Sequence, residues 1–256
     1  ATLLSNCVAC LYFLGIFYRI RRTSVLTPNP TVGLPQAGNM AAVFGVGIPS
    51  AVASLLFDLD YVVIDKLMVA YSEVALAAIG IVLKVERLPL NVGIGICQGM
   101  VPLVAYNCAA GNEKRMNRVI RLSLGTGLAV AAASILLYEA FTPWIVRVFI
   151  SDSATVQLAD TFLRIRILAT PLMFLSFFTV YIFQGFGNGR ISLFLGVMRW
   201  AVFNIPMLFL LNHLVGMYGI VWSQITADVL TVALSAFVYR TRRPRFDGEG
   251  HILPRV

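Results

Sequence analysis

The sequence of 256 residues is 59% hydrophobic and only 12% charged, and its formal net charge is +8. A soluble protein carries about 25% charged residues, and so few polar side chains leave too much apolar surface facing water. The composition therefore excludes an ordinary water-soluble domain and predicts an all-α integral membrane protein. Because the basic residues fall between apolar stretches, the net charge does not indicate a nucleic-acid partner.

Apolar stretches long enough to cross a bilayer occur about seven times along the chain. A transmembrane helix needs about 20 mostly apolar residues. The stretches of this length are residues 2–18, 41–69, 76–107, 119–140, 157–184, 193–212 and 216–238. The third and fifth are longer than a straight crossing requires, so we expect each to be tilted or broken.

The spans divide the chain into four parts. Residues 1–18 form the first span, and residues 19–40 are expected to be a cytoplasmic linker because the 23–40 stretch holds three prolines. Residues 41–240 are expected to form a six-helix bundle, and residues 241–256 a basic cytoplasmic tail. The chain begins at Ala1 and lacks the basic start of a signal peptide, so we expect a fragment that lacks an N-terminal half.

The distribution of Lys and Arg predicts the orientation. Basic residues gather in the linker, in the loops at 111–121 and 185–199 (which includes Arg199) and in the tail, whereas the opposite loops hold only Arg147. The side rich in Lys and Arg faces the cytoplasm. We therefore expect a multi-pass protein of the cell (inner) membrane, with its first residue outside and its C-terminus in the cytoplasm.

Ionisable residues inside the spans form the first group of candidate site residues. At a rise of about 1.5 Å per residue, Asp58 and Glu86 lie about 16 and 15 Å from the outer ends of their spans. Arg164 and Arg166 reach a similar depth. Asp60 points away from Asp58, toward a different neighbouring helix. Buried charges of this kind either carry protons and ions or pair statically. Asp58, Asp60 and Glu86 are therefore candidate ion-coupling residues, and static ion pairing is the competing interpretation.

Two further groups of residues are candidates for function. Helix breakers concentrate in the third span, where the candidate hinge residues are Pro89, Gly95, Gly99 and Pro102. Broken helices are common where transporters bind or rock, although Gly and Pro are also ordinary in membrane helices. Candidate cavity-lining residues are the uncharged polar side chains Gln98, Asn107, Gln184 and Asn204. Of these we favour Gln98 as a lining residue. The alternative role of such side chains is to join helices by hydrogen bonds.

The sequence shows no sign of an enzyme. Cys7 and Cys10 form a C-x-x-C without a second pair, and the two histidines are far apart, so a metal site is not expected. No nucleophile lies in a recognisable pattern with a base. We expect neither catalysis nor a cofactor, apart from Na⁺ or H⁺ as a coupling ion.

Three stretches resemble the multidrug and toxic compound extrusion (MATE) transporters. Residues 79–121, IGIVLKVERLPLNVGIGICQGMVPLVAYNCAAGNEKRMNRVIR, match the pattern of the family's eighth helix. The matching residues are Gly95, Gln98, Gly99, Pro102, Tyr106, Asn107, Ala110 and Gly111. Residues 162–190 resemble its tenth helix, through Phe183, Gln184, Gly185, Gly187 and Arg190. Residues 217–228 resemble the start of its last helix.

The resemblance implies both a fold and an activity. The seven spans would correspond to helices six to twelve of a transporter in which two six-helix bundles face each other across a central cavity. The activity implied is antiport of amphipathic, often cationic drugs against Na⁺ or H⁺. The implied partners are these organic cations, the lipid bilayer and the missing N-terminal lobe.

The carry-over of the family's ion site is incomplete. Part of the family uses an acid on helix seven together with one on helix ten. Asp58 or Asp60 fills the first role, but the core of the tenth helix holds Arg164 and Arg166 and no acid. Another branch places its carboxylate in the N-terminal lobe.

Two other functions compete with drug export. A lipid-linked oligosaccharide flippase of the same superfamily needs a cationic cavity, and Arg87, Arg164 and Arg166 would supply it. A seven-helix membrane receptor would share the topology, but the broken third span and the short loops argue against it.

Overall fold

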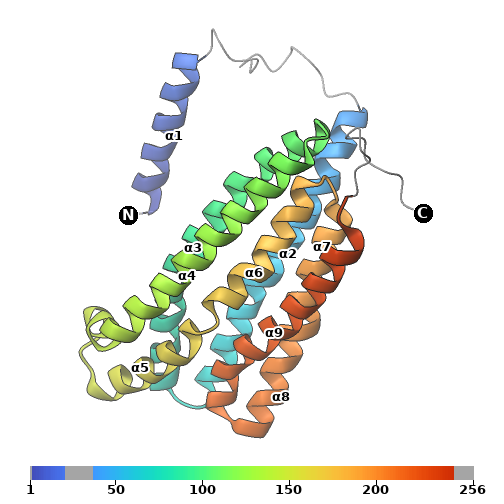
Figure 1. The fold of residues 1–256 in the computed structure, drawn as a ribbon. Helices are drawn as coiled ribbons and strands as arrows, with labels where there is room; N and C mark the ends of the chain where they lie inside the picture. The colour runs from blue at the N-terminus through green and yellow to red at the C-terminus, as the bar shows by residue number, and fades with distance from the viewer. Residues whose placement is uncertain (1, 21–36, 245–256) are drawn as a thin grey trace. The chain divides into compact units, whose positions relative to one another are not determined.

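The computed structural model describes residues 2–20 and 37–244, and every regular element in these ranges is helical. The elements are α1 (Thr2–Ile20), α2 (Ala37–Val69), α3 (Glu73–Ala109), α4 (Glu113–Phe149), α5 (Ser153–Ile167), α6 (Thr170–Gly185), α7 (Gly189–Val197), the π-helix η1 (Met198–Asn204), α8 (Ile205–Val215) and α9 (Met217–Arg242). Figure 1 shows their arrangement. Most of the predicted linker at 19–40 and of the predicted tail at 241–256 lies outside the described residues.

The chain divides into two compact units, Ala1–Phe44 and Gly45–Val256. The first unit contains α1 and the first turns of α2. The second contains the rest of α2 and all later helices, and it holds every candidate site residue. By length and composition, four helices in the described part of the chain suit a membrane span, or five if the bent pair α5–α6 counts as one. The finer expectation of seven spans, numbered six to twelve, remains a prediction.

Side-chain caps begin several of these helices where the sequence changes from turn to apolar residues. Ser72 accepts a hydrogen bond from the backbone of Ala75 and so starts α3. Asn112, Asp152 and Asn188 cap α4, α5 and α7 in the same way. These side chains satisfy backbone N–H groups that have no partner within the helix. Short turns place α3 beside α4 and α8 beside α9.

The break expected in the fifth span is present. α5 and α6 meet at an angle of 47°, with Pro171 in the first turn of α6. Proline has no N–H to donate to the preceding turn, and its ring crowds the carbonyl four residues back. By contrast α3 is one continuous helix through both Pro89 and Pro102. The sharp change of direction therefore lies in the fifth span.

The sixth span contains a wide turn rather than a break. Residues Met198–Asn204 form a π-helix, and the N–H of Ile205 donates to the carbonyl of Trp200, five residues back. Pro206 follows immediately, and an α-helical path would press its ring against the carbonyl of Val202. The π turn places one extra residue in the helix at this point.

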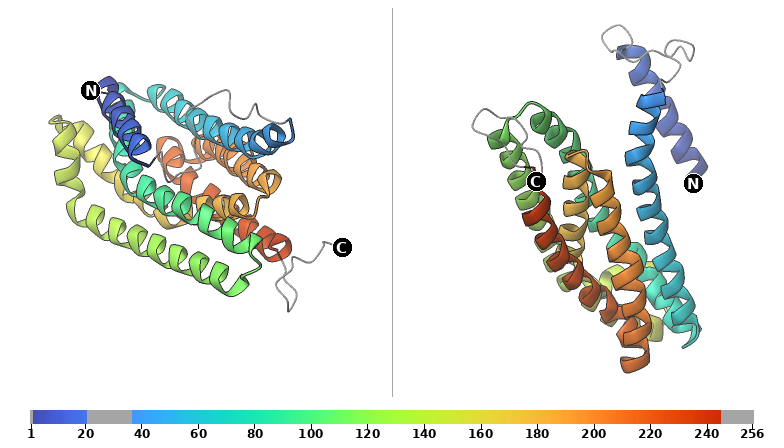
Figure 2. Two further views of the ribbon diagram at one scale, coloured as in Figure 1. Left: turned by 90° about the horizontal axis from the view of Figure 1, so that it is seen from above. Right: turned by 90° about the vertical axis from the view of Figure 1, so that its right-hand side faces the viewer.

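Helix α2 joins the bundle through only part of its length. Ile64 and Met68 are fully buried in the main core, together with side chains from α3, α5, α8 and α9. Closer to its start, the exposed side chains include Leu55 and Ile48. The right-hand view of Figure 2 shows the end of α2 beside the other helices of the second unit.

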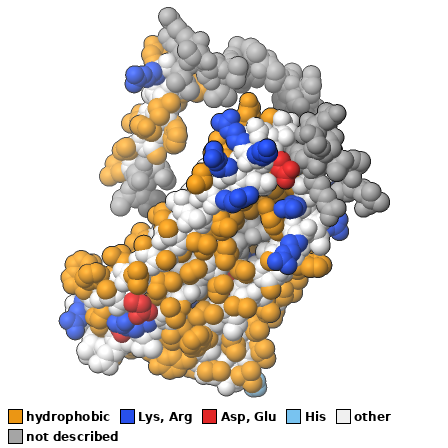
Figure 3. Space-filling view, viewed as in Figure 1, with side chains coloured by type: hydrophobic (Ala, Val, Ile, Leu, Met, Phe, Trp, Pro, Cys, Tyr) orange, Lys and Arg blue, Asp and Glu red, His pale blue; other side chains and the backbone are white. Residues whose placement is uncertain are grey.

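The surface of the second unit matches the predicted membrane setting. Figure 3 shows hydrophobic side chains over most of the visible bundle and Lys and Arg gathered near one end. The basic residues at this end include Lys114, Arg115, Arg118 and Arg121, which line a hollow of about 1130 Å³ at the start of α4. A lipid-facing belt with a basic end is the arrangement that bilayer insertion requires.

Candidate functional site

A cavity of about 580 Å³ lies between α2, α3, α6, α7 and η1. Its lining is Ser54 and Phe57 of α2; Ile94, Gln98, Val101 and Pro102 of α3; Phe177, Val180, Tyr181 and Gln184 of α6; and Gly196, Arg199 and Trp200 of α7 and η1. Mostly apolar walls with a few polar groups are typical of small-molecule sites.

Aromatic side chains form one wall of this cavity. The Phe57 ring is edge-on to the rings of Tyr61 and Trp200, with centroids 4.9 and 5.0 Å apart. Phe177 completes the group at 6.1 Å from Phe57. Such a wall offers flat apolar area and the negative faces of π-systems, which attract cations.

The structure separates the four predicted cavity-lining residues into two pairs. Gln98 and Gln184 line the cavity, and Gln98 donates a hydrogen bond of 3.4 Å to the hydroxyl of Tyr181. Asn107 is buried elsewhere and donates to the carbonyl of Leu103 on its own helix. Asn204 is buried in η1, and its amide nitrogen and oxygen find no partner among the described residues.

A buried ion pair joins α3 to α5. Nε and Nη2 of Arg166 donate to the two carboxylate oxygens of Glu86, at 2.7 and 2.8 Å. Both side chains are almost completely buried. Matched depth in the sequence indicated that acids of α3 and bases of α5 share a layer, and these two residues do meet. The two-point geometry favours the static interpretation for Glu86.

A second buried ion pair was not predicted. Nη2 of Arg199 on η1 lies 3.0 Å from Oδ1 of Asp228 on α9. Asp228 also accepts from Gln224 at 2.7 Å and from Ser176 at 3.5 Å. The sequence placed Arg199 among the basic loop residues at 185–199, and this was wrong, because its side chain is 2% exposed inside the bundle. The signal available for Asp228 was an acid in the middle of an apolar span.

Asp60 is a buried acid outside both of these pairs. It is 1% exposed, and its Oδ1 has no hydrogen-bond partner among the described residues. The charges that act on it are those of Arg166, Arg199, Glu86 and Asp228. As predicted from its place on the helix, Asp60 faces neighbours different from those of Asp58.

Asp58 forms a looser pair at the surface of the bundle. Its Oδ1 lies 3.7 Å from Nη2 of Arg87, and the two side chains are 69% and 44% exposed. The guanidinium of Arg87 also lies over the ring of Tyr61, 4.4 Å from its centroid. The pair therefore sits beside the aromatic wall but outside the buried charges.

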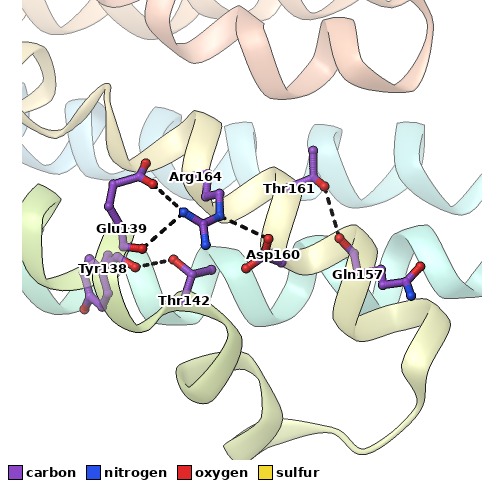
Figure 4. Close-up of polar contacts among 7 residues, drawn as sticks. All are labelled: Tyr138, Glu139, Thr142, Gln157, Asp160, Thr161 and Arg164. Atoms are coloured by element: carbon purple, nitrogen blue, oxygen red, sulfur yellow. Dashed lines mark hydrogen bonds and ion pairs between the residues drawn. The ribbon is translucent and has the colours of Figure 1, made fainter.

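Arg164 is held at the far end of α5. Figure 4 shows its guanidinium between Glu139 of α4 and Asp160 of α5. The distances are 2.7 Å to Oε2 of Glu139 and 3.1 Å to Oδ2 of Asp160. Arg164 also donates to the main-chain carbonyl of Glu139. These contacts bind α4 to α5, and none of the three residues lines the cavity of about 580 Å³.

The hinge candidates occupy two kinds of site on α3. Pro89 is buried, whereas Gly95 and Gly99 have open space where a side chain would begin. Pro102 lines the cavity. Their role as hinges remains a prediction. No cluster of three or more potential metal ligands from His, Cys, Asp and Glu occurs within residues 2–20 and 37–244.

Comparison with known proteins now decides the family. A model of the MatE family matches residues 49–210. This range includes every residue that lines the cavity, the ion pair of Glu86 and Arg166, and Arg199, but it does not reach Asp228. The chain belongs to the MatE family. The prediction made from residues 79–121 and 162–190 is confirmed.

Curated relatives of this MatE chain are export proteins. It is 28% identical over 242 residues to the multidrug export protein MepA of Staphylococcus saprophyticus and 29% identical over 245 residues to that of Staphylococcus aureus. Each match covers 94% of this chain and 53% of the relative. The chain thus spans about half the length of the relatives it matches. Their names agree with the expectation that it is not an enzyme.

Solved structures share the fold of this MatE chain. An outward-facing multidrug-resistance MATE transporter of the MOP superfamily matches with a TM-score of 0.84 and 17% identity. A MOP-superfamily transporter from Pyrococcus furiosus, described as having a binding pocket of reverse polarity, matches with a TM-score of 0.80 and 18% identity. They cover 94% of this chain, and this chain covers 54% and 55% of them. At these identities the likeness establishes the fold.

Proposed function

We propose that this chain forms one half of a secondary exporter that moves amphipathic, often cationic drugs in exchange for Na⁺ or H⁺. The remaining length of its relatives corresponds to a facing N-terminal lobe. Alternating access between the two lobes would expose the aromatic cavity first to one side of the cell membrane and then to the other. The names of the relatives and the wall formed by Phe57, Phe177 and Trp200 support drugs as the substrate.

The charge balance of the buried residues carries the coupling part of the proposal. Three acids (Asp60, Glu86 and Asp228) share the interior with two bases (Arg166 and Arg199). If all five are ionised, the group is one positive charge short, and a buried uncompensated charge is costly. A proton or a bound cation restores the balance.

Asp60 is the acid that best accepts this charge. Glu86 is bound at two points by Arg166, and Asp228 is bound by Arg199 and Gln224. Asp60 alone of the three lacks an ion-pair partner within 4 Å in the described part of the chain, and its Oδ1 has no hydrogen-bond partner there. We therefore assign ion coupling to Asp60. We give Glu86 a structural role, and we give Asp58, in its exposed pair with Arg87, no part in coupling.

The rival functions receive less support. The flippase interpretation needs free cationic groups in the cavity, but Arg166 is fully buried against Glu86, and Arg164 is bound to Glu139 and Asp160. Only Arg87 of the three proposed bases lies beside the aromatic wall. Membership of the MatE family sets aside the seven-helix receptor. The basic end of the bundle supports a cytoplasmic C-terminus.

The test is ion-driven export from membrane vesicles that contain the full-length protein encoded by the complete gene. A fluorescent organic cation is loaded, and either a Na⁺ or a H⁺ gradient is imposed. We expect one gradient to drive export in the wild type and Asp60→Asn to abolish it. Asp58→Asn, two residues away on the same helix, is the matched control and should retain export. Export by neither gradient, or transport of a labelled lipid-linked oligosaccharide instead, would overturn the proposal.

A further inference from the structure

Arg199 is bound less completely than the neighbouring buried arginine. Arg166 places two nitrogens on the two oxygens of one carboxylate. Arg199 places one nitrogen, Nη2, 3.0 Å from Oδ1 of Asp228 as an ion pair. None of its three guanidinium nitrogens makes a hydrogen bond with a described residue, so Nε and Nη1 are unused. Because buried donors normally have partners, a guanidinium with two unused nitrogens is able to accept a second carboxylate.

The second carboxylate is already in place. Asp60 is buried with an unpartnered oxygen, and Arg199 is one of the charges that act on it. Their helices meet at the edge-on rings of Phe57 and Trp200, about one turn from Asp60 and one residue from Arg199. The charged or titratable groups facing Arg199 are Asp228, Asp60 and Tyr61.

Asp228 has neutral hydrogen-bond donors beside it as well as Arg199. Gln224 donates to its Oδ2 at 2.7 Å. The hydroxyl of Ser176 lies 3.5 Å from its Oδ1 and also 2.9 Å from the carbonyl of Leu172, so its one proton serves either acceptor. If Arg199 leaves, the bond from Gln224 remains and the Ser176 hydroxyl is able to turn to Asp228. In the described part of the chain, Glu86 accepts hydrogen bonds from Arg166 alone, so the same exchange is not available there.

The local backbone supplies a way for Arg199 to move. Arg199 lies in η1, whose π turn contains one residue more than an α turn. A shift of the extra residue along the helix, on the N-terminal side of Pro206, rotates each residue that it passes about the helix axis by roughly 100°. Single π turns inside α-helices are frequent at functional sites. The faces of the guanidinium rest on Phe177 and Trp200, 4.3 Å from each centroid, so its edge is what exchanges partners.

We propose that Arg199 is a shared counter-ion that alternates between Asp228 and Asp60 during the transport cycle, with the π turn of η1 as the moving part. This rests on the proposed ion-coupled export and adds to it a residue that senses whether Asp60 is charged. With a proton or cation on Asp60, Arg199 stays with Asp228, as in this structure. When Asp60 is free and ionised, it draws Arg199 away.

Trp200 provides a direct probe, because its ring lies against the guanidinium. These 256 residues contain three tryptophans, Trp144, Trp200 and Trp222. The double variant W144F/W222F, with every tryptophan of the other half of the protein also replaced by Phe, leaves Trp200 as the sole emitter. We expect its fluorescence in nanodiscs to change in a single transition as pH or Na⁺ concentration is varied. Asp60→Asn and Asp228→Asn, each made in this background, should both abolish the transition by removing one of the two partners.

Glu86→Gln is the matched control, since it removes a buried acid that is not part of the exchange, and Asp58→Asn is a second control if Glu86→Gln folds poorly. Both should keep the transition. A signal that does not change in the W144F/W222F background, or a transition that persists in Asp60→Asn, overturns the proposal. The fluorescence needs no transported drug, so loss of export with an intact transition would count against the proposed function alone.

Discussion

Glu86 and Arg166, 80 positions apart in the sequence, form a two-point ion pair with nitrogen–oxygen distances of 2.7 and 2.8 Å. The pair joins α3 to α5 just before the 47° bend between α5 and α6. It therefore fixes the outer part of the fifth span against the third, while the aromatic cavity lies on the other side of the bend.

The first prediction concerns the stability that this pair provides. Glu86→Gln leaves the buried guanidinium of Arg166 without a counter-charge, and such a loss costs about 3–5 kcal/mol. We expect less folded protein and a much lower thermal midpoint, measured by fluorescence-detected gel filtration after heating. The double variant E86L/R166M removes both charges and should recover much of the loss. Equal stability of Glu86→Gln and the wild type would contradict the structural role.

The second prediction concerns the exposed pair of Asp58 and Arg87. Their charged atoms are 3.7 Å apart and both side chains reach the surface, so the pair contributes about 0–1 kcal/mol. Asp58→Asn should leave the thermal midpoint nearly unchanged in the same assay. A loss as large as that of Glu86→Gln would show that Asp58 has a buried role that this structure lacks.

The third prediction separates hinge glycines from packing glycines. A Cβ added at Gly95 or Gly99 meets no atom within 4 Å, so alanine fits and, in a helix, stabilises by about 0.5–1 kcal/mol. If these positions bend during transport, Gly95→Ala and Gly99→Ala reduce export although the protein is as stable as the wild type.

Gly219→Ala is the contrasting variant. A Cβ at Gly219 would overlap the main-chain carbonyl of Leu211, because α8 and α9 lie close together at this point. We expect the free energy of unfolding to fall by about 1–3 kcal/mol. Thermal midpoints and export rates are measured together for all three variants. Full export by Gly95→Ala and Gly99→Ala would remove the hinge hypothesis for these two residues.

The fourth prediction is a pH dependence at the start of α5. Oδ2 of Asp152 accepts from the hydroxyl and the backbone N–H of Thr155, and these hydrogen bonds lower the pKa of Asp152 below its ordinary value of 3.8. Because the pKa is lowered in the folded state, the stabilisation is complete at pH values above the ordinary pKa. The stabilisation disappears as pH falls through the folded-state pKa.

The measurement is the difference in thermal midpoint between the wild type and Asp152→Asn as a function of pH. The wild type should be the more stable of the two at neutral pH, and the difference should shrink at pH values below 3.8. Thr155→Val, which removes the hydroxyl donor, should reduce the difference at neutral pH. A difference that is constant down to acidic pH would show that the Asp152 carboxylate does not act through its charge.

The sequence by itself determined the family and the all-helical, apolar class of the chain. These features depend on local patterns: apolar length and the Gly, Gln and Pro spacing around Gln98. The depth argument also placed Glu86 and Arg166 in one layer, because the rise of a helix is regular. The length of the fifth apolar stretch predicted its break, since it exceeds what a straight crossing requires.

Only the tertiary structure decided which charges meet. Arg199 looked like a loop residue, and Asp228 belonged to no pattern, because their pairing depends on a π turn and on the packing of α9 against it. Likewise, sequence placed Asp58, Asp60 and Glu86 together as equal candidates, whereas packing exposes the first, isolates the second and binds the third to Arg166. A partner in space is set by rotation and tilt between helices, and no pattern within one helix records them.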